Sequence, residues 1–178
     1  MGSGNFSGIG GGSGEASADV ASDIFLHVKT QRAGKIKGEC ATENHVDDIA
    51  VLHWSWGVAA NTAIGSNQST ARRSYKHLVL TKRIDSASTG LLSALVSNDA
   101  VSEAVLSMRK AGGEALDYFR MTLNEARVVN VEVTVDDDGR AVETVAFAFT
   151  KIEIEYQRQQ VQGSGSGASV FTDEAIGA

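Results

Sequence analysis

Apolar residues alternate with polar or small residues along several segments, at the period of two typical of β-strands with one buried face. In residues 23–28 the even positions are aliphatic, namely Ile24, Leu26 and Val28. In residues 51–58 the even positions are Leu52, Trp54, Trp56 and Val58. We therefore expect Trp54 and Trp56 to lie in the core. His53 and Ser55 should point from the opposite, leaner face of the same strand.

A longer alternation follows from Phe119 to Val135. Its odd positions are apolar except for Glu125 and Arg127, which indicates one long strand or two collinear strands. Asp136–Gly139 comes next and has the Asp and Gly residues typical of a hairpin loop.

The apolar positions then change parity between two neighbouring runs. They are odd in the first run and even in the second, as the residues Val145, Phe147, Phe149, Ile152, Ile154 and Tyr156 show. A shift of one residue turns every side chain to the other face of a sheet. We therefore predict a β-bulge near Thr150, of the kind that curves a sheet into a barrel.

One segment has the spacing of a helix. Its apolar stripe consists of Leu91, Leu92, Leu95 and Val96. Ser86 or Ser88 is placed to cap its first turn. The predicted fold is mainly β: a barrel of two antiparallel sheets with one flanking α-helix. The polar segment 59–73 is too long for a tight hairpin and is expected to be a functional or disordered loop.

The chain is divided unevenly by composition. Residues 1–22 are rich in Gly and Ser and are expected to form a flexible arm, and residues 163–167 have a similar Gly-Ser alternation. Residues 23–172 have the length of one domain with a substantial core. Residues 173–178 are expected to be a short tail.

Composition narrows the function classes. The formal net charge of -6 opposes the phosphate neutralisation that nucleic-acid binding requires. No segment is apolar over the length of a membrane span, and the N-terminus has no basic and apolar regions of a Sec signal. The single cysteine, Cys40, has no partner for an internal disulfide, which suits folding in the reducing cytosol. We expect no membrane insertion, and any export should proceed without a Sec signal.

The residues offer little catalytic chemistry. The four histidines have no metal-ligand spacing, and no phosphate-binding glycine motif is present. Cys40 with His45 could form a nucleophilic pair, but a lone cysteine is more often inert. Asp136–Asp138 lacks the ligand spacing of a calcium loop, and Glu39, Glu43, Asp47 and Asp48 are interpreted as surface charge. We predict no catalytic, cofactor-binding or metal site and therefore no enzyme.

A series of short motifs, in order, resembles the Hcp family of type VI secretion tube proteins. The motifs span most of the predicted domain: IKGE at Ile36–Glu39, VLHWSWG at Val51–Gly57, LTKRID at Leu80–Asp85 leading into the helix, MRKAGG at Met108–Gly113, Tyr118 with Thr122–Leu123, and the segment Glu143–Tyr156. Each motif is weak alone, and their order makes the resemblance strong.

The resemblance implies a β-barrel subunit that forms a homohexameric ring. Rings would stack into a tube that a contractile sheath expels with a VgrG-type spike, and small effector proteins would ride in the lumen. Assembly would take place in the cytoplasm and be followed by secretion. Two other functions stay open: a tail-tube subunit of a phage-like contractile particle, and a monomeric β-barrel binding module.

Two sets of residues are candidates for contacts in such a ring. His53 and Ser55, on the lean strand face, would line the lumen and touch cargo, or else face solvent without a role. Arg72 and Arg73, at the end of the polar loop, would pair with acidic residues such as Glu43 and Asp47 of an adjacent subunit or ring. The alternative for that loop is a solvated segment without a partner.

Overall fold

The computed structural model describes residues 23–61, 72–109, 116–158 and 167–175. Within these ranges it contains one helix, α1 (Ser88–Val96), and twelve strands. The strands are β1 (Ile24–Thr30), β2 (Gly34–Ile36), β3 (Ile49–Ala50), β4 (His53–Ser55), β5 (Val58–Asn61), β6 (Arg72–Tyr75), β7 (Leu78–Arg83), β8 (Val101–Arg109), β9 (Asp117–Val135), β10 (Ala141–Ala148), β11 (Lys151–Gln157) and β12 (Ala168–Glu174). β12 thus includes Asp173 and Glu174, which the sequence analysis assigned to a tail.

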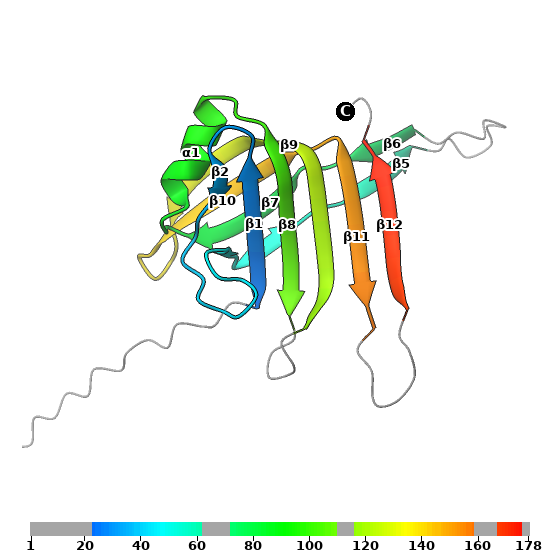
Figure 1. The fold of residues 1–178 in the computed structure, drawn as a ribbon. Helices are drawn as coiled ribbons and strands as arrows, with labels where there is room; N and C mark the ends of the chain where they lie inside the picture. The colour runs from blue at the N-terminus through cyan, green and yellow to red at the C-terminus, as the bar shows by residue number, and fades with distance from the viewer. Residues whose placement is uncertain (1–22, 62–71, 110–115, 159–166, 176–178) are drawn as a thin grey trace, which may run out of the picture.

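Ten of the twelve strands form two antiparallel sheets that share β9. The first sheet has the order β2, β1, β8, β9, β11, β12, with β3 also paired to β1. The second has the order β9, β10, β7, β4. The first sheet faces the viewer in Figure 1 and the second crosses behind it. The predicted mainly-β fold of two antiparallel sheets and one helix is confirmed.

β9 is a single strand of 19 residues, which confirms one of the two alternatives for this segment. Met121 and Leu123 are buried, and beyond them Ala126 and Val128 are buried, so the buried face changes from odd to even positions. Glu125 lies at the change, with a φ of 50°. The predicted interruption of the apolar odd positions at Glu125 and Arg127 therefore marks the point where the strand passes from the first sheet to the second.

The prediction of a β-bulge near Thr150 is wrong, because the chain bends there between two separate strands. β10 ends at Ala148 in the second sheet, and β11 begins at Lys151 in the first. Phe149 and Thr150 form a bend between two strands. The change of parity therefore reflects a change of sheet. The loop between β9 and β10 is the predicted hairpin, with hydrogen bonds from Asp136 N to Arg140 O and from Gly139 N to Asp136 O, each 2.9 Å.

Residues 49–55 connect the other edges of the two sheets. β3 pairs with β1 and β4 pairs with β7. Between them, Val51 N donates to Ile24 O at 3.0 Å and Leu52 N donates to Thr81 O at 2.8 Å. The core lies between the sheets and is closed by β9 on one side and by this segment on the other.

β1 is buried on both faces over part of its length. Leu26 and Val28 belong to the core, as the alternation predicts. Phe25, expected on the polar face, is buried as well, because its ring lies 4.0 Å from the ring of His45 in a stacked arrangement. A loop that is distant in the sequence therefore covers the second face of the strand.

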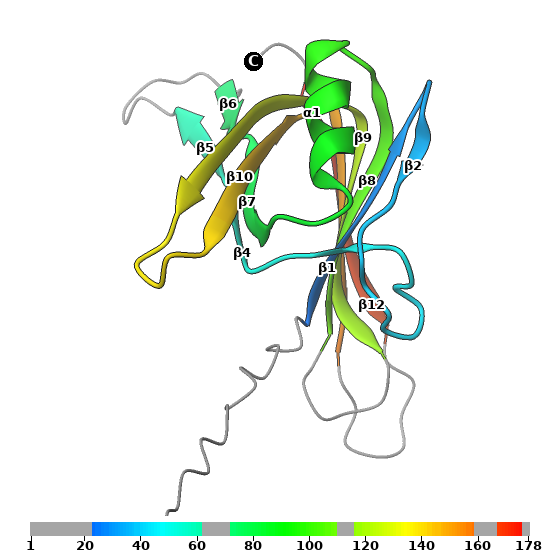
Figure 2. The ribbon, with the colours of Figure 1, turned by 90° about the vertical axis from the view of Figure 1, so that its left-hand side faces the viewer.

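The helix α1 lies between the two sheets in Figure 2. It buries Ser88, Leu91 and Ala94, whereas Leu92 and Val96 are exposed, so the predicted stripe is partly wrong. The N-cap residue is Ala87, without a side-chain cap. The Ser88 hydroxyl accepts a hydrogen bond from Asp85 N at 3.1 Å and donates to Glu143 Oε2 at 2.6 Å, so it holds the helix start to β10.

The segment expected to be a polar loop, 59–73, is partly a β-ribbon. β5 and β6 pair antiparallel in a two-stranded sheet of their own, from Val58 with Tyr75 to Asn61 with Arg72. Residues 62–71 between them lie outside the described residues, as do 110–115, which follow β8, and the segment 1–22. The helix in the described part of the chain is too short to be a membrane span.

Candidate assembly interface

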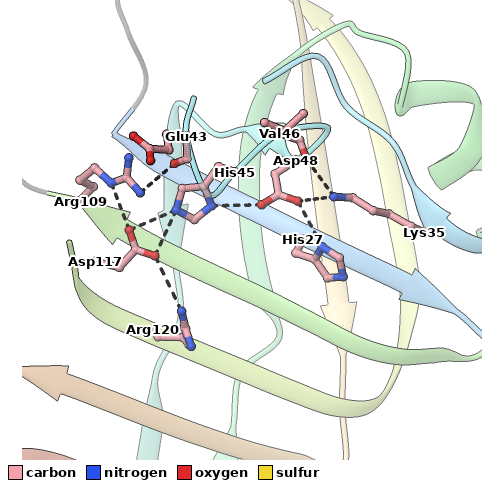
Figure 3. A network of polar contacts seen from close by, with 9 residues as sticks. All are labelled: His27, Lys35, Glu43, His45, Val46, Asp48, Arg109, Asp117 and Arg120. Carbon is pink, nitrogen blue, oxygen red and sulfur yellow. Dashed lines mark hydrogen bonds and ion pairs between the residues drawn. The ribbon is translucent and has the colours of Figure 1, made fainter. Parts of the chain in front are cut away.

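The loop 37–48 is held against the first sheet by a network of charged side chains (Figure 3). At its centre is His45, which is buried. Its Nδ1 lies 3.0 Å from Asp48 Oδ2, and its Nε2 lies 3.1 Å from both carboxylate oxygens of Asp117. Both ring nitrogens of His45 are therefore within hydrogen-bond distance of a carboxylate. His45 thus joins the loop to the start of β9.

Asp48 is the second centre of the network. Its carboxylate also accepts from Lys35 Nζ at 2.9 Å and lies 3.1 Å from His27 Nδ1. Burial alone would raise the pKa of Asp48. The hydrogen bonds from Lys35, His45 and His27 outweigh burial and hold that pKa below its ordinary value of 3.8.

Asp48 should therefore make stability depend on pH. A lowered carboxyl pKa adds stability above the unfolded-state pKa, and this contribution disappears as the pH falls through the folded-state pKa. We expect Asp48→Asn to reduce the free energy of unfolding at pH 7 by about 1–3 kcal/mol. The difference from the wild type should shrink below pH 3.8. Urea denaturation of the wild type and of Asp48→Asn, at pH 7 and at pH 3, measures this difference in the free energy of unfolding.

Asp47→Asn is the matched control for this prediction. Asp47 pairs with Lys37 at 3.0 Å, but both side chains are substantially exposed. Such pairs contribute little, so this variant should lose less than about 1 kcal/mol at either pH. If Asp48→Asn reduced the free energy of unfolding equally at pH 7 and pH 3, the lowered pKa of Asp48 would not be the source of the stabilisation.

Arg109 completes the network from the end of β8. Its Nε lies 3.3 Å from Asp117 Oδ1, its Nη2 donates to Glu43 O at 3.1 Å, and its guanidinium stands 5.6 Å from the centre of the Phe25 ring. Arg120 adds a longer ion pair to Asp117, at 3.9 Å. These contacts attach the loop 37–48, called the acidic loop below, to β1, β8 and β9. The exposed residues of this loop are therefore held in place by the first sheet.

The four residues predicted at a ring or stacking contact lie at two separate places. Glu43 and Asp47 are on the loop 37–48, at the lower left of Figure 1, whereas the ribbon of Arg72 and Arg73 is at the upper right. Arg73 forms an ion pair with Asp173 on β12. The side chain of Arg72 lies outside the described residues. Within one chain, the structure therefore does not bring Arg73 to the acidic loop.

The alternation predicted for residues 51–58 holds only at β4, which ends at Ser55 before Trp56; Val51 is buried in the core and Val58 is exposed, both contrary to the prediction. His53 and Ser55 are exposed on β4. Trp54 and Trp56 pack against the core but are half-buried. The ring of Trp54 stacks on that of Phe119 with centroids 5.6 Å apart, and the ring of Trp56 lies 6.3 Å from that of Tyr75. Ser55 opens onto a hollow of about 440 Å³ that is also lined by Trp56, Tyr75, Lys76, His77 and Val79.

The candidate nucleophile Cys40 has surroundings that oppose thiolate formation. Burial, followed by the nearby carboxylates of Asp48 and Asp85, raises the pKa of its thiol. Both ring nitrogens of His45 are already engaged by Asp48 and Asp117. Among the described residues, no cluster of three or more His, Cys, Asp or Glu side chains could hold a metal ion.

The sequence analysis did not identify the exposed apolar strand edges. Val133 and Val135 are exposed near the end of β9, and Val170 and Phe171 are exposed on β12. The alternation in β9 placed its valines in a core, but Val133 and Val135 pair with β10 at the end of the second sheet, where both side chains are exposed. The signal for β12 was weaker, because Ala168–Glu174 has only two large apolar residues.

Comparison with known proteins agrees with this fold. Residues 25–156 match the family model described as "Type VI secretion system effector, Hcp". The chain is 31% identical over 115 residues to Protein hcp1 of Pseudomonas aeruginosa, covering 63% of this chain and 68% of that relative. It is 29% identical over 97 residues to the Major exported protein of the same organism, covering 53% of this chain and 56% of that relative.

A solved structure described as a type VI secretion system effector from Yersinia pestis superimposes with a TM-score of 0.68. It is 25% identical, and the match covers 86% of this chain and all of that one (100%). The family match extends from β1 to β11 and includes both sheets and the helix. This chain therefore belongs to the Hcp family of type VI secretion system proteins.

Proposed function

We propose that this chain is the structural subunit of a type VI secretion tube, in which homohexameric rings stack and are expelled by a contractile sheath. The observation that carries the proposal is the family match over residues 25–156, which spans the described fold from β1 to β11. The role is structural and not enzymatic. The partners would be further copies of this chain, the sheath and a VgrG-type spike, after assembly in the cytoplasm and before secretion.

The arrangement of the surface supports self-assembly. A ring of identical subunits needs two different surfaces on each subunit, one for each neighbour. The acidic loop 37–48 and the β5–β6 ribbon lie on opposite sides of the folded molecule in both views (Figures 1 and 2). A contact of Arg72 or Arg73 with Glu43 or Asp47 would therefore join different copies, within a ring or between stacked rings.

The lumen is proposed to include His53 and Ser55. Both are exposed on β4, and Ser55 borders the hollow beside Trp56. The indole Nε1 of Trp56 is buried and has no hydrogen-bond partner among the described residues. Small effector proteins in the lumen are the proposed cargo.

Purified protein should form rings of six copies, visible by negative-stain electron microscopy and with a matching mass by light scattering. A monomer at all concentrations would contradict the tube function and favour a monomeric binding module. Ser55→Trp, on an exposed position, should leave the rings intact and reduce cargo export from cells. Normal export by that variant would remove Ser55 from the cargo contact.

A further inference from the structure

Two elements of the described structure have little packing of their own. β5 and β6 form a ribbon that pairs with no other strand among the described residues. A ribbon of two strands alone is at best marginally stable in water. β12 pairs with β11 alone, at the margin of the first sheet. Each element therefore needs a further contact to hold it in one position.

Side-chain burial in these two elements is confined to one residue of each. In the ribbon, Tyr75 is half-buried and the other described side chains are exposed. In β12, Asp173 is half-buried and the other six residues are exposed. These two residues, 98 positions apart in the sequence, contact each other, because the Tyr75 hydroxyl donates a hydrogen bond to Asp173 Oδ2. The ribbon and β12 therefore meet at the one partly covered side chain of each.

Arg73 adds a charged contact to the same carboxylate. Its Nη1 donates to Asp173 Oδ2, so this oxygen accepts hydrogen bonds from two ribbon side chains. The side chain of Asp173 is 15% exposed, whereas that of Arg73 is 57% exposed. Hydrogen bonds to an ionised carboxylate are stronger than those between neutral groups. The carboxylate of Asp173 is therefore the acceptor on which the position of the ribbon depends.

Tyr75 also connects this contact to the body of the molecule. Its ring lies 6.3 Å from that of Trp56 and packs edge-on against that of Phe149 at 6.2 Å. Trp56 and Phe149 both pack against the core. The two rings therefore fix the ring of Tyr75, while its hydroxyl contacts β12. A displacement of Tyr75 would act on the ribbon and on β12 together.

We propose that Asp173, with Tyr75 and Arg73, is a latch through which the ribbon and β12 become ordered together and loosen together. When either element is displaced, the other loses the contact that fixes it, so each stabilises the other. The consequence for assembly rests on the proposed function, in which Arg73 contacts another copy. A guanidinium has five N–H donors, so Arg73 can keep Asp173 and still bind a second carboxylate. The latch then holds Arg73 in one position for that contact.

Amide hydrogen exchange of the full chain tests the latch. Asp173→Asn should speed exchange by about tenfold or more in β5, β6 and β12, because a neutral amide is a weaker acceptor for both ribbon donors. Tyr75→Phe keeps the ring and removes only a hydroxyl of the ribbon, yet it should also speed exchange in β12. Exchange in β7 and β10 should not change in either variant. All proteins are compared in the same state of assembly, as measured by light scattering.

Glu174→Gln is the matched control for Asp173→Asn. It removes the same charge from the next position of β12, where the side chain is exposed, and it should leave exchange in the ribbon unchanged. The double variant Tyr75→Phe with Asp173→Asn should exchange within about twofold of Asp173→Asn alone, because both substitutions remove the same hydrogen bond. Effects of the two substitutions that multiply independently would overturn the latch.

The remaining outcomes separate the latch from the tube function. Faster exchange confined to the element that carries the substitution would overturn the latch, because the ribbon and β12 would then be held independently. In electron micrographs, Asp173→Asn should form rings as the wild type does but far fewer stacked tubes; normal stacking would overturn the role of the latch in assembly. A wild-type protein that never assembles would overturn the proposed function, whereas the exchange experiment needs only the folded chain and still decides the latch.

Discussion

Lys82→Met should lower the free energy of unfolding by about 3–5 kcal/mol, one of the two largest effects expected for a single substitution in this chain. Lys82, on β7, is fully buried, and its ammonium faces the start of α1 and β10. Its ammonium lies 2.7 Å from both Glu143 Oε2 and Asp85 Oδ1, and 3.1 Å from Ser88 Oγ. Methionine fills a similar volume, but it leaves two carboxylates close together without their cation.

A graded series tests this explanation. Glu143→Gln should cost less than Lys82→Met, because Lys82 keeps Asp85 and the amide oxygen can still accept a hydrogen bond. Lys151→Met is the matched control, since the Lys151–Glu125 pair at 3.0 Å is exposed and screened by solvent, so its loss should have a much smaller effect. Urea denaturation should compare all proteins at one concentration, because assembly adds to apparent stability.

An effect of Lys82→Met no larger than that of Lys151→Met would contradict the proposed importance of the buried cluster. The same result would mean that the two carboxylates find other donors or water when the lysine is removed. Loss of the helix signal in circular dichroism, with the strands retained, would instead locate the effect at the link between Ser88 and Glu143.

The alternation of apolar residues predicted much of the fold because it depends only on the pleat of a strand. It placed His53 and Ser55 on an exposed face, and the structure agrees. The period could not show that Phe25 is buried, since its cover comes from a loop twenty residues away. It also could not show where β9 leaves one sheet for the other, because the change occurs at Glu125 within an unbroken strand.

The sequence pattern gave an indication of the buried cluster around Lys82. Leu78, Leu80 and Lys82 occupy one face of β7, so the lysine continues an apolar stripe. The second half of the signal, Glu143, lies 61 residues away on the neighbouring strand β10 and pairs directly with Lys82 in register. The candidate contacts of a ring are harder to predict, because a single chain does not reveal which exposed apolar residues another copy covers.

Gly38→Ala should destabilise the folded chain by about 2–3 kcal/mol, because its added methyl group has no space. A Cβ at this position would lie 2.3 Å from Asp48 O and 2.8 Å from both Asp48 C and Ile49 Cα. All three are backbone atoms, so no side-chain rotation can relieve the contact. The backbone is close here because Gly38 N donates to Asp47 O at 3.0 Å and Cys40 N donates to Asp48 O at 3.1 Å.

The consequence of Gly38→Ala should spread beyond the substituted residue. Moving the backbone of Asp48 pulls its carboxylate away from His45 and Lys35, so the network that holds the loop 37–48 should weaken. Amide hydrogen exchange should become faster throughout this loop, while the second sheet stays protected. An unchanged exchange pattern would show that the alanine is accommodated locally and that the loop is not held by this close approach.

Gly57→Ala separates the loss of space from the general effect of replacing glycine. A Cβ at Gly57 would have Lys76 Cδ as its nearest neighbour, at 3.8 Å, which is an ordinary contact. The substitution should therefore change stability by no more than about 0.5 kcal/mol in either direction. Equal losses for Gly38→Ala and Gly57→Ala in urea denaturation would exclude the close backbone approach as the cause. A loss confined to Gly38→Ala, with faster exchange in residues 37–48, would establish that the acidic loop depends on a glycine at this position.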